Sequence, residues 1–209
     1  MNTNFEKSAG TSLIIGSILM IITMVLHPVG GDFQHLLSIV TIAVISHSIA
    51  VLSIPFVAYG FWGITSRLDS EPFLSRIAFS FMFFGLVAVM IAAALNGMVL
   101  TGFIQRYADA TPEIIESIRP IMTYNFTLNH AFDFIYIGAV CISTLFWSVA
   151  ILKTKSLPVW TGYFGLLLTG VAVVLLVAGF VFVDVHGFRL FIFGAVAWTI
   201  SVGFLLRKS

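Results

Sequence analysis

Histidine, aspartate and asparagine side chains are the groups in this chain that can do chemistry, because most of the residues around them are apolar. Imidazole and carboxylate groups together can bind Zn or Fe, and two facing imidazoles can hold a haem iron. The same groups can form hydrogen bonds with a small polar ligand. The candidate ligand-binding residues are His27, His47, Asn96, Asn129, His130, Asp133, Asp184 and His186. Among them, His47, His130 and Asp133 are the candidate metal ligands.

The spacing of several candidates places them on a common helix face. His130 and Asp133 are three residues apart, and Asn125, Asn129 and Asp133 recur every four residues. Residues at such spacings are neighbours on a helix surface. A metal-activated water beside Asp133 would allow hydrolysis, but the chain has no HExxH or comparable zinc motif. Whether the protein is an enzyme therefore stays open at the level of sequence.

The composition indicates an integral membrane protein. Apolar residues make up 59% of the 209 residues and charged residues 9%, against roughly 25% charged in soluble domains. The mean hydropathy is +1.08. We therefore expect the lipid bilayer to be the main partner. The formal net charge of +1 gives no indication of nucleic-acid binding, and the single cysteine, Cys141, excludes an intrachain disulfide.

The apolar runs predict an all-α polytopic membrane protein, a single domain over residues 1–209 built as a bundle of six transmembrane helices. A spanning helix needs about 20 mostly apolar residues, and lipid favours helices because they satisfy their own backbone. The six predicted spans are residues 10–28, 36–64, 76–104, 125–151, 159–183 and 187–206.

Three prolines suggest local details of these helices. Pro55 falls inside the second span and predicts a kink there. Pro112 suits the first turn of a helix, whereas Pro120 is expected to stop one. The sequence therefore predicts a short surface helix over about residues 112–119, lying between the third and fourth spans.

Basic residues orient the predicted bundle with both termini in the cytoplasm, N-in and C-in. In that orientation the inner side carries seven basic residues, which are Lys7, Arg67, Arg76, Lys153, Lys155, Arg207 and Lys208. The outer side carries three, which are Arg106, Arg119 and Arg189. Cytoplasmic loops are enriched in Lys and Arg, so this orientation is favoured.

Counting residues from the inner ends places the candidate residues in one outer layer. About 20 residues cross the bilayer, and this count ends close to a candidate histidine, asparagine or aspartate on each helix. The sequence therefore predicts an outward-facing pocket, with His47, His130 and Asp133 at its centre and His27, Asp184 and His186 at its rim. A metal ion, a haem or a small polar ligand are the alternative occupants.

Other interpretations remain open. Histidine and aspartate also occur near membrane interfaces as solvated or helix-capping groups, and each candidate can be read in that way. The same pocket would serve a small transporter or channel component, with the break at Pro55 as a moving part. A non-catalytic membrane scaffold subunit is the third alternative. The sequence allows an oligomer or a partner subunit but does not indicate one.

The stretch AILKTKSLPVWTGYFGLLLTG, residues 150–170, joins the fourth and fifth predicted spans. A basic loop, Leu-Pro, and then Trp and Gly opening a helix resemble a pattern in uncharacterised six-helix bacterial membrane proteins. The hydropathy plan is similar to theirs over most of the chain. The resemblance implies a multi-pass protein of the bacterial inner membrane, and it carries over no functional residue.

Overall fold

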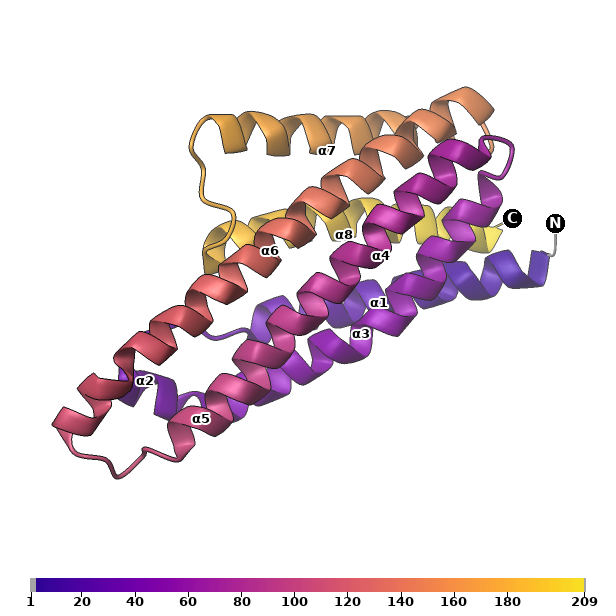
Figure 1. Ribbon diagram of the computed structural model, residues 1–209. Helices are drawn as coiled ribbons and strands as arrows, with labels where there is room; N and C mark the ends of the chain where they lie inside the picture. The colour runs from indigo at the N-terminus through magenta and orange to yellow at the C-terminus, as the bar shows by residue number, and fades with distance from the viewer. Residues whose placement is uncertain (1–2, 209) are drawn as a thin grey trace.

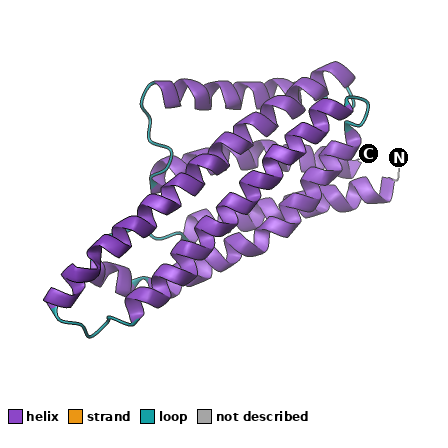
Figure 2. Ribbon diagram, viewed as in Figure 1, coloured by secondary structure: helices purple, strands orange, loops and turns teal. Residues whose placement is uncertain are grey.

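The computed structural model describes residues 3–208 as a bundle of helices. Of the residues between 3 and 208, 86% are helical and none is in a strand. Figures 1 and 2 show long helices lying side by side, joined by short loops, with the two ends of the chain at the same end of the bundle.

Six helical segments are long and apolar enough to cross a membrane. They are α1 (Thr3–Leu26), α3 (Val40–Arg67), the continuous segment Pro72–Gln105, α6 (Pro112–Thr154), α7 (Val159–Val177) and α8 (Val185–Lys208). Many large apolar side chains are exposed on the bundle surface, for example Phe73 at 75% and Val177 at 83%. The all-α, six-helix prediction is confirmed, and the apolar surface suits a multi-pass membrane protein in contact with lipid.

The packing pairs sequence neighbours and also joins the two ends of the chain. α1 lies against α3 and α8, the segment that begins with α4 (Pro72–Ala94) lies against α6, and α7 lies along α6. α1 and α8 approach closely at Gly10, where an added Cβ would lie 2.5 Å from the carbonyl oxygen of Gly203. Small residues allow such close helix contacts in membranes.

A stack of aromatic rings fills the middle of the bundle. Trp147 of α6 stacks between Phe61 of α3 and Trp198 of α8, with centroid distances of 5.1 and 6.3 Å. The indole nitrogen of Trp198 donates a hydrogen bond to the carbonyl of Thr161 in α7, at 3.0 Å. Both tryptophans are fully buried, so this stack ties four helices together.

An ion pair closes the end of the bundle that holds the termini. The Arg67 guanidinium donates to the Glu6 carboxylate at 3.0 Å, and the Glu6 side chain is 2% exposed. Arg67 Nε also donates to the carbonyl of Ser156, in the loop between α6 and α7. A single arginine thus links α1, α3 and this loop.

Several predicted helix boundaries differ from the structure. The predicted span 36–64 is divided at Ile39 into a short helix α2 (Phe33–Ser38) and α3, and α3 then runs through Pro55 as one helix. The third span contains α4, a π-helix η1 (Leu95–Leu100) and α5 (Thr101–Gln105). The predicted end of the fifth span at residue 183 is also wrong.

The fifth span ends early because the chain turns at Gly179. The backbone of Gly179 has a φ of 84°, and the N–H groups of Gly179 and Phe180 bond to the carbonyls of Leu176 and Leu175. These two bonds form a Schellman motif, in which a left-handed glycine terminates a helix.

The separate surface helix over residues 112–119 was a wrong prediction. α6 begins at Pro112 and continues through Pro120 to Thr154. Proline removes only one helical hydrogen bond and its φ is compatible with a helix. Glu116, whose carbonyl loses its helical partner, is on an exposed stretch, where water can satisfy that oxygen.

Candidate functional site

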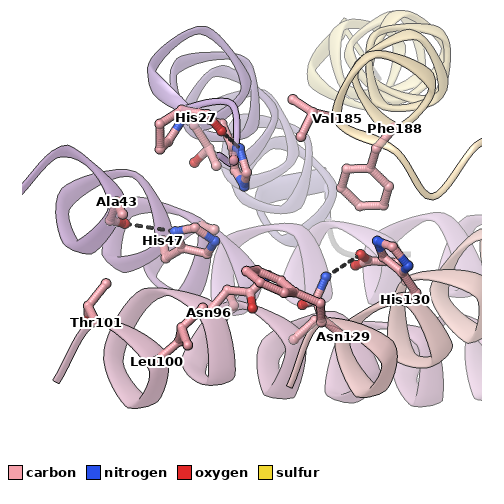
Figure 3. Close-up of a pocket in the computed structure, with 18 of the residues that line it drawn as sticks. His27, Ala43, His47, Asn96, Leu100, Thr101, Asn129, His130, Val185 and Phe188 are labelled. Atoms are coloured by element: carbon pink, nitrogen blue, oxygen red, sulfur yellow. Dashed lines mark hydrogen bonds between the residues drawn. The ribbon is translucent and has the colours of Figure 1, made fainter. Parts of the chain in front are cut away.

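A cavity of about 340 Å³ lies near the end of the bundle opposite the termini. Its wall is formed by the ends of α1 and α4, by α2, α3, η1, α5 and α6, and by the start of α8. Seven of the eight predicted site residues line it: His27, His47, Asn96, Asn129, His130, Asp133 and Asp184. Figure 3 shows the histidine and asparagine side chains arriving from different helices.

His186 is the one predicted residue that does not line the cavity. The carboxylate of Asp184 accepts a hydrogen bond from the N–H of Gly187 at 2.6 Å and so caps the start of α8. Residues two positions apart on a helix do not face the same side. With Asp184 at the cavity wall, His186 is therefore directed elsewhere, and its side chain is exposed.

Two histidines meet at one wall of the cavity. The rings of His27 and His47 have centroids 4.8 Å apart and an interplanar angle of 54°. The Nδ1 atom of His27 lies 2.9 Å from the carbonyl oxygen of Pro28, and that of His47 lies 2.7 Å from the carbonyl of Ala43. A carbonyl can only accept, so each Nδ1 carries the proton, and each neutral ring keeps a lone pair on Nε2.

The π-helix η1 and a glycine make room for His47. A Cβ added at Gly97 would lie 2.2 Å from the Cβ of His47, so only glycine fits at this crossing of α3 and η1. The hydroxyl of Thr101 donates to the carbonyl of Gly97 at 2.7 Å, which satisfies a backbone group in the π turn. Single π turns inside α-helices occur frequently at functional sites.

Amide and carboxylate groups of α6 form the other wall. Asn129 Nδ2 donates to Asp133 Oδ2 at 2.7 Å, and Asn125 Nδ2 donates to Asn96 Oδ1 of η1 at 2.9 Å. Asp133 is 8% exposed, whereas His130 is exposed and reaches the cavity from the adjoining turn. Within residues 3–208, Asp133 has no nitrogen of Lys, Arg or His within 4.0 Å.

The predicted metal set is not assembled. Among residues 3–208, no group of three or more His, Cys, Asp or Glu side chains has an arrangement that could hold a metal ion. His47 of α3 lies against His27. Asp133 is instead bonded to Asn129, and both of these residues are on α6. The rings of His27 and His47 are in direct contact, so this pair leaves no room for a porphyrin between them.

Sequence reasoning missed two residues that shape the site. Thr23 lies one helical turn before His27, and its buried Oγ1 has no hydrogen-bond partner among the described residues. Arg189 donates to the carbonyls of Met24 and His27 and so fixes the chain after α1. The spacing of four residues between Thr23 and His27 is the one signal that could have found the threonine.

His27 follows the last residue of α1 and is mostly buried. Burial, and to a smaller extent the neighbouring His47, lowers the pKa of His27 from 6.5 to about 4. Its ring is therefore neutral at pH 7, which leaves Nε2 as an acceptor.

No protein-family model, curated protein or solved structure matches this chain.

Proposed function

We propose that this membrane protein binds a small molecule with an apolar body and a hydrogen-bonding head in the cavity between its helices. The observation that carries the proposal is the cavity itself, with about 340 Å³ of space and nine polar residues in an otherwise apolar lining. Small-molecule sites are concave and mostly apolar, with a few placed polar groups that fix the ligand's orientation.

In the proposed orientation the cavity opens on the outer side of the bacterial inner membrane. The basic residues concentrated at the other end of the bundle, together with the termini, support this orientation by the positive-inside rule. A ligand would then reach the cavity from outside the cell or from the outer leaflet.

Transport is the second candidate function. A smaller cavity of about 50 Å³ shares Thr23, Ala50 and Phe188 with the first, and a third of about 20 Å³ follows it deeper in the bundle. Beyond these, the bundle is filled by the stacked rings of Trp147 and Trp198. The narrowing of these cavities toward a packed core favours binding over conduction.

A cavity-filling variant tests the proposal. The purified protein is heated with increasing concentrations of 2-phenylethylamine, 2-phenylethanol or 3-phenylpropanoate, and the unfolding temperature is measured. A ligand that binds the folded state raises this temperature as its concentration rises. Ala50 lines the first two cavities, so Ala50→Phe is expected to remove the rise.

Ala197→Phe is the matched control, because Ala197 is exposed on α8 and lines none of these cavities. This control should respond to the compounds as the wild type does. If no compound raises the unfolding temperature of the wild type more than that of Ala50→Phe, the cavity is not a binding site for this kind of molecule. A scaffold subunit would then be the better interpretation.

A further inference from the structure

Asp133 is a carboxylate inside the bundle without a positive partner among residues 3–208. Its side chain is 8% exposed, and its one hydrogen-bond donor is the neutral amide of Asn129. The guanidinium of Arg189, which lies beside the cavity, donates to the carbonyls of Met24 and His27 instead. A buried charge needs a partner to offset its lost hydration, and ionisable groups in membrane helices normally have one.

From this imbalance we infer the class of the ligand, an inference that rests on the function proposed above. The cavity binds an organic amine, whose protonated amino group pairs with Asp133 while its compact apolar body fills the remaining space. The amine supplies the positive charge that the described part of the chain does not place near Asp133.

The other polar atoms of the cavity also suit a donor-rich head. The Nε2 atoms of His27 and His47 have no hydrogen-bond partner among residues 3–208 and carry lone pairs, because Nδ1 of each ring is the protonated nitrogen. Asn129 uses its amide nitrogen on Asp133, which leaves its oxygen as an acceptor. An alkylammonium group has three donors and no acceptor, so the oxygens of Asp133 and Asn129, which lie together on α6, are complementary to it.

The apolar part of the wall is consistent with the body of such a ligand. Phe126 and Phe188 both line the cavity, and Figure 3 shows Phe188 on the α8 side of it, facing α6. Aromatic rings attract cations through their negative faces, most strongly where water is excluded. An anionic ligand would instead meet the carboxylates of Asp133 and Asp184 in the same cavity.

Three probes of similar shape separate charge from size. The wild-type protein in lipid nanodiscs is titrated with 2-phenylethylamine, 2-phenylethanol and 3-phenylpropanoate, and each Kd is measured by equilibrium dialysis. A hydrogen bond to a charged group is worth more than one between neutral groups, so the amine should bind about tenfold more tightly than the alcohol. The carboxylate should bind most weakly.

The substitution Asp133→Asn keeps the shape of the side chain and removes its charge. The amine should then bind no more tightly than the alcohol, while the alcohol's own Kd should stay within about twofold of the wild-type value. Unchanged alcohol binding also shows that the variant is folded. Glu116→Gln, which alters an exposed carboxylate of the same helix away from the cavity, should leave all three affinities unchanged.

Three outcomes would overturn the inference. The wild type could bind the amine and the alcohol equally, in which case the cavity binds ligands and the proposed function stands without the amine. The preference could survive in Asp133→Asn but be lost in Asp184→Asn, which would assign the charge to the wrong residue. If no probe binds the wild type, the proposed function fails together with the inference.

Discussion

Replacing Gly97 by alanine is expected to destabilise the bundle and to disturb the cavity together. The added Cβ would lie 2.2 Å from the Cβ and 2.6 Å from the Cγ of His47, whereas ordinary contacts begin at 3.4 Å. The Cβ of His47 is fixed to the backbone of α3, so turning the side chain cannot relieve the overlap. α3 and η1 must therefore separate by about 1 Å at this crossing.

The cost follows from overpacking and from one weakened hydrogen bond. Overpacking a tight contact costs about 1–3 kcal/mol, and loss of the bond from His47 Nδ1 to Ala43 adds about 1 kcal/mol. Alanine recovers at most about 1 kcal/mol of helix propensity. The net loss in the free energy of unfolding is then about 1–3 kcal/mol, with weaker binding of any ligand held by His47.

Gly102, which lies in α5 directly after η1, gives a matched control. An added Cβ there has no atom within 4 Å, so Gly102→Ala should be neutral or slightly stabilising. Both variants are compared with the wild type by denaturant unfolding in the same detergent. Equal stability of Gly97→Ala and Gly102→Ala would refute the reasoning, because it would show that the crossing can relax freely.

Two further predictions concern charged and titrating groups. Glu6→Gln should lower the free energy of unfolding by about 2–3 kcal/mol, because Arg67 loses its ionic partner. Glu6→Met combined with Arg67→Met should recover much of this lost stability in the same denaturant assay. A double variant as unstable as the single one would contradict the argument. The folded-state pKa of His27 is near 4, below the value of 6.5 expected for the unfolded chain, so its contribution is complete above pH 6.5 and is lost as the pH falls toward 4. Between pH 7 and pH 5, the unfolding temperature should therefore fall further in the wild type than in His27→Gln. An equal fall in both proteins would contradict this assignment.

The number of helices could be predicted because the bilayer restricts the solutions. A long apolar run in lipid must satisfy its own backbone, and a helix does so with a constant rise of 1.5 Å per residue. That constant rise also let the height of each polar residue be counted from the basic ends of the helices. Six residues chosen in this way line one cavity, and Asn129, which was chosen by its spacing from Asp133, lines it as well.

The contacts between the polar residues of the cavity could not be predicted. The height of a residue along its helix does not fix how that helix is rotated about its axis. The pairing of His27 with His47 depends on how α1 is rotated against α3, and Asp133 is too far from this pair to complete a metal set. Two local features also lack a sequence signal. The π-helix at Leu95–Leu100 has no distinct apolar period, and Pro120 looks like a helix stop but lies within α6.

The bonds already made by the cavity residues favour a site that is formed before a ligand arrives. The ring of His47 is anchored by the carbonyl of Ala43 and the ring of His27 by the carbonyl of Pro28, while Asp133 is anchored by Asn129. In each residue the anchor uses one atom of the polar group and leaves the other atom as an acceptor: Nε2 of the rings or the second carboxylate oxygen. Because these side chains are held in place, a ligand would not have to order them on binding. Specificity would then come from matching a fixed set of acceptors, for which a head with several N–H donors is the best complement.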